Sequence, residues 1–118
     1  MRCSKLSEKL LIEEAKRRAT IFSKLTYYLK IIVNTAKRLD SNAEVYLFGS
    51  VALGNYLLSS DIDILIVTNL LPELVISKLW EEGIEDPFEI HVINKDLIGL
   101  YRKRSKLINV EGLINQKE

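Results

Sequence analysis

The chain has 118 residues, 47% of them hydrophobic, and its 17 basic and 16 acidic side chains leave a net charge of +1. A chain of this length buries one core and has little room for a second domain, so we expect a single domain over residues 1–118. The near-neutral balance excludes a global attraction to nucleic acid or to an anionic membrane. Any anion binding must be local, and binding of nucleic acid is left open.

The N-terminal region and the cysteine content indicate the compartment. Cys3 is the only cysteine, which excludes a disulfide framework and a cysteine-rich metal site. The basic start is followed by only three apolar residues before Glu13, unlike a secretory signal, and no stretch has the length of a membrane span. We expect a soluble protein of a reducing cytoplasm, without membrane association.

Hydrophobic periodicity divides the chain into alternating helices and strands. Residues 5–39 have a helical period that fits either one long helix or two abutting ones. The other predicted helices cover residues 51–56, 72–82 and 95–104, and in the second of these we expect Trp80 to pack on the sheet. The predicted strands cover residues 44–48, 61–67 and 88–93, with a loop over 57–60 and a weakly patterned tail from residue 105. This alternation favours an α/β or α+β fold built on one sheet.

Two aspartates stand at the start of an otherwise apolar strand, DIDILIV. Because side chains alternate along a strand, Asp61 and Asp63 point the same way and lie roughly 6.6 Å apart along the chain. Carboxylates at this spacing can converge on one oxygen-ligated divalent cation or bridge two. The alternative is that Asp61 caps the preceding loop and Asp63 pairs with a lysine, which accounts poorly for a charge flanked by strand residues.

A Gly-Ser pair precedes these aspartates, where the strand EVYLF ends. Gly49 allows close approach of the backbone to a ligand, and N–H groups at a helix start attract phosphate. Gly49 and Ser50 alone would equally suit an ordinary turn. The informative feature is the combination: a strand, Gly-Ser, a spacer of ten residues and Asp-x-Asp in the next strand.

This combination resembles the minimal nucleotidyltransferases of the polymerase-β-like superfamily, over about residues 25–105. The resemblance implies a mixed sheet of three to four strands packed by helices, with a long N-terminal helical region. It implies that Asp61 and Asp63 are catalytic and hold two Mg²⁺ ions, with Mn²⁺ as a substitute. It also implies nucleotide binding by Gly49, Ser50 and Ser60.

The same family has a third acidic residue on a later strand, and the match here is Glu89 in FEIHVI, as a catalytic and metal-binding residue. Many relatives have the shorter aspartate, and many carry a basic residue soon after the serine, where this chain has Val51-Ala52-Leu53. Glu89 would otherwise be a solvent-facing residue of an edge strand. His91 shares its face by alternation, but we expect it to be a rim residue outside the catalytic set.

Two functions follow from the resemblance. The first is transfer of a nucleoside monophosphate, AMP from ATP in the first place, to a hydroxyl acceptor on a protein partner. The second is an antitoxin or nucleotide-binding subunit, weakly active or inactive, that pairs with an all-helical HEPN protein. The N-terminal helical region has more apolar positions than one small sheet can cover, among them Leu10, Leu11 and Ile12. We therefore expect exposed apolar surface on this region and a homo- or hetero-oligomer.

Overall fold

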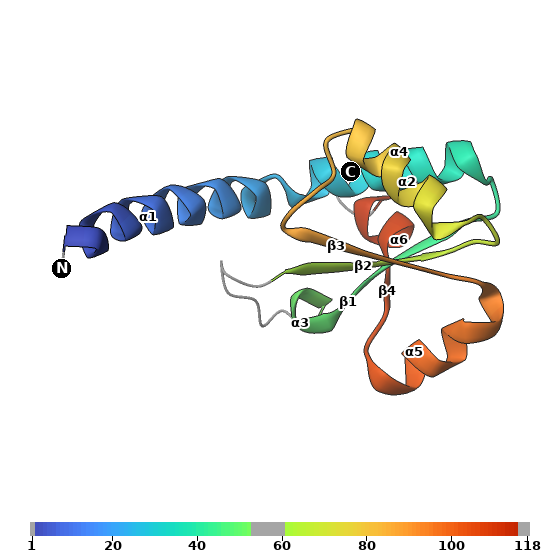
Figure 1. The fold of residues 1–118 in the computed structure, drawn as a ribbon. Coiled ribbons are helices and arrows are strands. Elements are labelled where there is room, and N and C mark those ends of the chain that lie inside the picture. The colour runs from blue at the N-terminus through green and yellow to red at the C-terminus, as the bar shows by residue number, and fades with distance from the viewer. Residues whose placement is uncertain (1, 53–60, 116–118) are drawn as a thin grey trace.

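A four-stranded mixed sheet forms the centre of the fold in the computed structural model, which describes residues 2–52 and 61–115 (Figure 1). The strands are β1 (Glu44–Phe48), β2 (Ile62–Val67), β3 (Phe88–Ile93) and β4 (Ile108–Asn109), in the spatial order β3-β2-β1-β4. β1 is antiparallel to β2 and β4, whereas β2 and β3 are parallel. The predicted mixed sheet is confirmed, and the weakly patterned tail supplies its fourth strand.

The N-terminal region forms two helices, α1 (Arg2–Ser23) and α2 (Leu25–Leu39). α1 extends away from the sheet (Figure 1), and Leu10, Leu11 and Ile12 on it are exposed, as the sequence predicts. Near its end, Arg17 pairs with the Asp86 carboxylate at 2.6 Å and also donates to the Asp86 carbonyl at 3.1 Å. This contact ties the end of α1 to the turn before β3.

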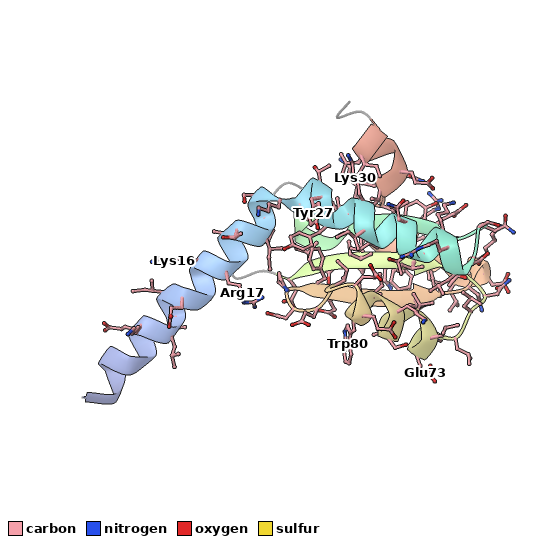
Figure 2. The ribbon with its side chains drawn as sticks, turned by 90° about the horizontal axis from the view of Figure 1, so that it is seen from above. Lys16, Arg17, Tyr27, Lys30, Glu73 and Trp80 are labelled. Carbon is pink, nitrogen blue, oxygen red and sulfur yellow. The ribbon has the colours of Figure 1, made fainter. Side chains whose placement is uncertain are left out.

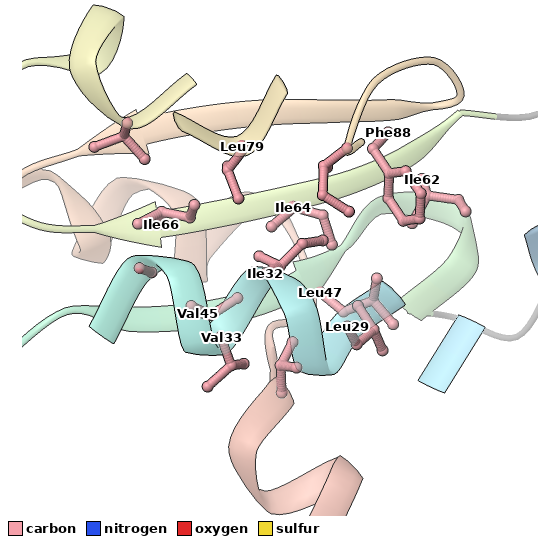
Figure 3. Packing of buried hydrophobic residues seen from close by; sticks show 14 of the residues in the cluster. Leu29, Ile32, Val33, Val45, Leu47, Ile62, Ile64, Ile66, Leu79 and Phe88 are labelled. Carbon is pink, nitrogen blue, oxygen red and sulfur yellow. The ribbon is translucent and has the colours of Figure 1, made fainter. Parts of the chain in front are cut away.

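One face of the sheet carries the larger core (Figure 3). The alternating residues Ile62, Ile64 and Ile66 of β2 are fully buried there, beneath α2 and α4 (Pro72–Glu81). α6 (Val110–Asn115) completes this helical layer beside α2 and β1. The apolar side chains of this face therefore fix β2 in the sheet. The opposite face of the same strand carries the candidate site.

The opposite face is only partly covered. α5 (Ile98–Arg104) lies across it, preceded by the 3₁₀ turn η1 (Lys95–Leu97) (Figure 1). A smaller apolar cluster beneath α5 comprises Tyr46, Phe48, Leu65, Val67 and Ile93. Asp63, Glu89 and His91 lie on this same face by strand alternation, at the end of the sheet away from Ile93.

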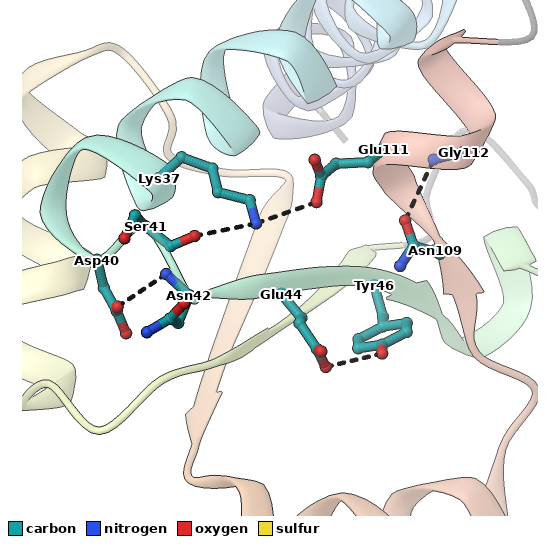
Figure 4. A network of polar contacts seen from close by, with 9 residues as sticks. All are labelled: Lys37, Asp40, Ser41, Asn42, Glu44, Tyr46, Asn109, Glu111 and Gly112. Atoms are coloured by element: carbon teal, nitrogen blue, oxygen red, sulfur yellow. Dashed lines mark hydrogen bonds and ion pairs between the residues drawn. The ribbon is translucent and has the colours of Figure 1, made fainter.

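Polar contacts fix the connections between these layers (Figure 4). Lys37 of α2 pairs with Glu111 of α6 at 3.2 Å and donates to the Ser41 carbonyl at 3.4 Å. Asp40, which ends α2, accepts a 2.5 Å hydrogen bond from Thr68 Oγ1 at the end of β2. α2 is thereby held at its C-terminal end to α6 and β2.

Two helical predictions need correction. The helix predicted over 51–56 is α3 (Gly49–Ala52), and residues 53–60 lie outside the described part of the chain. The helix predicted over 95–104 is divided into η1 and α5, although Asn94 caps it as predicted, accepting from Asp96 N at 3.0 Å.

Trp80 does not pack on the sheet. Its side chain is 64% exposed and projects outward from α4 (Figure 2). Val75 and Leu79 form the buried stripe of this helix, and Trp80, the next residue, lies about 100° around the axis from Leu79. Among the described helices, none combines the length and the apolar character needed to cross a membrane.

Candidate active site

Two of the predicted site residues, Asp63 and Glu89, lie side by side at the end of the sheet where β1 ends and β2 and β3 begin. Phe48, the last residue of β1, is the strand partner of Asp63 in β2. Asp63 is in turn the partner of Glu89 in the parallel strand β3. The register therefore sets the two carboxylates side by side on neighbouring strands, on the face that α5 only partly covers.

Asp63 is the most enclosed carboxylate of this edge, with 25% of its side chain exposed. Burial raises the pKa of the Asp63 carboxyl, His91 opposes this rise, and the negative charge of Asp61 adds to it. An isolated charge in such a position is disfavoured. A bound cation would offset this cost.

The close approach of the Asp63 carboxylate to the backbone requires glycine at position 49. Its φ is +75°, in the region that glycine adopts without steric cost. A Cβ at this position would overlap Asp63 Oδ2 and lie 3.2 Å from Asp63 Cγ. The backbone turn into α3 therefore passes directly against the Asp63 carboxylate.

His91 joins the two carboxylates. One ligand atom each of Asp63, Glu89 and His91 lies within 4.8 Å of the others. His91 Nε2 is 3.4 Å from Glu89 Oε1 and 3.8 Å from Asp63 Oδ1. The ring packs edge-on against Phe48, with 5.1 Å between ring centroids, and its Nε2 atom is buried without a hydrogen-bond partner among the described residues.

The remaining predicted residues have different placements. Asp61 directly precedes β2 and is exposed, outside the three-residue cluster found in the described chain, although close enough for its charge to act on Asp63. Ser50 belongs to α3, but its side chain is not among those described. Ser60 lies outside the described residues.

The sequence prediction left His91 out of the site. The available signal was alternation, since His91 lies two residues after Glu89 and so shares its face. What the sequence could not provide was the register, which pairs Glu89 with Asp63 and sets His91 opposite Leu65, diagonally from Asp63. Two carboxylates and an imidazole form a donor set that suits a divalent ion, and the unpartnered Nε2 supports this fit.

Known proteins resemble this chain in sequence and in fold. Residues 29–112 match the family described as "Nucleotidyltransferase domain". No curated protein matches the chain. A crystal structure described as a "putative nucleotidyltransferase" is 27% identical, with a TM-score of 0.54, over 68% of this chain and 96% of that one.

A second structure, described as a "putative nucleotidyltransferase" from Sulfolobus solfataricus, is also 27% identical, with a TM-score of 0.49, over 81% of this chain and 83% of that one. The family match extends from α2 through β4 into α6 and includes every residue of the candidate site. The chain therefore belongs to the nucleotidyltransferase domain family.

Proposed function

We propose that this protein is a metal-dependent nucleotidyltransferase that transfers a nucleoside monophosphate, AMP from ATP in the first place, to a hydroxyl group. One observation carries the proposal: the Asp63 carboxylate lies against Gly49 at the start of α3, beside Glu89 and His91. Membership of the nucleotidyltransferase domain family supports the reaction class.

The acidic residues of the site would bind the metal in this proposal. Asp61, Asp63 and Glu89 would hold two divalent ions, Mg²⁺ or Mn²⁺, which would neutralise the triphosphate and the leaving pyrophosphate. The acceptor oxygen bonds to the α-phosphorus as the bond to pyrophosphate breaks. Glu89, which is exposed, would also accept the proton of the attacking hydroxyl.

The phosphates would lie along the turn that follows β1. Gly49 brings the backbone close to Asp63, so that a nucleotide held by Gly49, Ser50 and Ser60 would have its phosphates near the carboxylates. Because residues 51–53 are all apolar, the charge of the triphosphate would be met by the bound ions, by backbone N–H groups and by basic residues from elsewhere in the chain.

The acceptor, in our proposal, is a hydroxyl of a protein partner. α1 carries Leu10, Leu11 and Ile12 exposed to 60%, 68% and 56%, on a helix that extends away from the sheet (Figure 1). Exposed apolar side chains gathered in this way are typical of an interface. A HEPN-type helical protein or a second copy of the chain would cover them, which also favours the second candidate function, a partner-binding antitoxin.

Transfer of label tests the enzyme proposal. The purified protein is incubated with ATP labelled at the α-phosphate, with Mg²⁺ or Mn²⁺, alone and with the product of a neighbouring gene. We expect metal-dependent transfer that Asp63→Asn abolishes and that Glu81→Gln, which removes an exposed carboxylate of α4 on the opposite face of the sheet, leaves intact. Equal transfer by the wild type and Asp63→Asn would refute the assignment of the site.

Light scattering tests the partner proposal. We expect a dimer or a complex with the co-expressed neighbour, and Leu11→Lys should weaken it because the charge would enter an apolar interface. Lys16→Ala, a change on the same helix that removes no apolar residue, serves as the control (Figure 2). A stable monomer, both in the pure protein and in the protein co-expressed with its neighbour, would contradict the proposed partner and the antitoxin function.

A further inference from the structure

We propose that His91 is a metal ligand, and that its imidazole makes this site select Mn²⁺ and similar transition-metal ions over Mg²⁺. The inference deepens the proposed function and rests on it, because it concerns the same site. It departs from the all-carboxylate set that the family resemblance implies for the bound ions.

The position of His91 Nε2 is the first observation. This atom is buried, without a hydrogen-bond partner among the described residues, yet it lies 3.4 Å from Glu89 Oε1 and 3.8 Å from Asp63 Oδ1. Donor atoms at neighbouring positions around a small divalent ion are about 3 to 3.5 Å apart, given bond lengths of about 2.0–2.2 Å. The two distances from Nε2 are therefore close to the spacing that one ion requires, and all three ligand atoms lie within 4.8 Å of one another.

The orientation of the ring is the second observation. His91 contacts Phe48 with 5.1 Å between centroids at 72°, and Tyr101 of α5 at 6.5 Å and 65°. Phe48 and Tyr101 also pack against each other at 90°, so the two rings form a fixed corner around the imidazole. This corner limits rotation of the imidazole and keeps Nε2 directed towards the carboxylates.

The chemistry of the donor set then favours transition metals. Mg²⁺ prefers oxygen ligands and keeps several waters, whereas imidazole suits Zn²⁺, Cu²⁺, Fe²⁺ and Ni²⁺. Carboxylates suit Mn²⁺ as well, but this transition-metal ion accepts one imidazole among them more readily than Mg²⁺ does. Replacing one oxygen ligand by Nε2 costs Mg²⁺ more than it costs these ions. A site of Asp63, Glu89 and His91 should accordingly discriminate between Mn²⁺ and Mg²⁺.

An ion pair is the competing interpretation of the same geometry. A protonated His91 would neutralise Asp63 and Glu89 directly, with no ion between them. In that case removing His91 would leave two repelling carboxylates and would strengthen the binding of a cation. The metal-ligand proposal predicts the opposite sign, so one substitution separates the two.

Electron spin-echo modulation of bound Mn²⁺ tests ligation directly. His91 is the only histidine of the sequence, so an imidazole ¹⁴N coupling in protein prepared without a histidine tag can come only from this residue. We expect this coupling with Mn²⁺ alone in the wild type and its absence in His91→Gln. Bound Mn²⁺ without ¹⁴N coupling in the wild type would overturn the proposal.

Calorimetric titration with Mn²⁺ and Mg²⁺ tests selectivity. We expect His91→Gln to weaken Mn²⁺ binding at least about tenfold and to change Mg²⁺ binding less than about threefold, because an imidazole is a better ligand for a transition-metal ion than for Mg²⁺. Glu81→Gln should match the wild type. Unchanged or tighter Mn²⁺ binding in His91→Gln would overturn the proposal and favour the ion pair.

The failure of this inference is distinct from failure of the proposed function. If His91→Gln keeps both Mn²⁺ affinity and label transfer, His91 is not a ligand, while the nucleotidyltransferase assignment stands on the carboxylates. If the wild type binds neither ion in calorimetry and transfers no label, both proposals are wrong.

Discussion

Replacing Gly49 by alanine disturbs the contact between the Gly49 backbone and the Asp63 carboxylate without removing any functional group. Gly49 has φ +75°, and an added Cβ would overlap the Asp63 carboxylate. We expect two consequences: strain in the backbone, which lowers stability, and displacement of Asp63, which weakens metal binding and nucleotide transfer. Gly83 offers a matched control, because its φ is +88° and a Cβ there would meet nothing within 4 Å.

The magnitudes follow from these two positions. A non-glycine residue in the left-handed region costs about 1–2 kcal/mol, so Gly83→Ala should lower the free energy of unfolding by that amount. Gly49→Ala should lower it by at least as much, since the overlap with Asp63 adds to the backbone term. A displacement of a catalytic group by about 1 Å can reduce a rate about a hundredfold, which is the loss of transfer that we expect for Gly49→Ala.

Urea denaturation measures the stability of both variants, and calorimetry with Mn²⁺ measures the site. The expected pattern is a loss of stability in both variants but a loss of Mn²⁺ affinity in Gly49→Ala alone. Wild-type Mn²⁺ affinity and transfer in Gly49→Ala would refute the reasoning that the carboxylate depends on the bare backbone at this turn.

Three further predictions concern the core, the pH dependence of stability and the metal. Leu79→Ala should lower the free energy of unfolding by about 2–5 kcal/mol, because Leu79 is fully buried. Trp80→Ala should change it by less than about 0.5 kcal/mol, because Trp80 is exposed. Equal losses of stability in urea denaturation would contradict the exposure of Trp80. The hydrogen bond from Thr68 is the main cause that lowers the pKa of Asp40 below 3.8. This hydrogen bond therefore stabilises the fold fully above pH 3.8, and the stabilisation is lost as the pH falls through the lower pKa of Asp40 in the folded state. Thr68→Val should therefore be less stable than the wild type at pH 6, with a deficit that shrinks below pH 3.8 in acid denaturation, and a constant deficit would contradict this origin. Because burial raises the pKa of Asp63, its charge is unfavourable in the metal-free fold at neutral pH, and Asp63→Asn should be at least as stable as the wild type. With Mn²⁺ at about a hundred times its dissociation constant the wild type should gain about 2.7 kcal/mol and the variant nearly nothing, and an equal gain in thermal unfolding would contradict metal binding at Asp63.

Much of the fold could be predicted because local patterns determine it. The alternation in DIDILIV put Asp63 on one face and the isoleucines on the other, and the structure buries Ile62, Ile64 and Ile66 together as expected. Pro72 stands in the first turn of α4, and Gly83 follows its end with a positive φ, both as the turn chemistry predicts.

The failures concern information that a single stretch of sequence does not contain. The pairing of Asp63 with Glu89 depends on the register of β2 and β3, which contacts between distant segments determine, so His91 could not be assigned to the site. Trp80 was expected in the core because it is large and apolar. The direction in which α4 presents its residues to the sheet depends on Val75 and Leu79, and leaves Trp80 exposed.

A crystal structure with Mn²⁺ and a non-hydrolysable ATP analogue would test the central claim most directly. The anomalous scattering of manganese locates the ion independently of the coordinates of the protein. The account predicts an anomalous peak between Asp63, Glu89 and His91, with the triphosphate along the Gly49 turn. A nucleotide bound elsewhere, or manganese absent from Asp63, would contradict it.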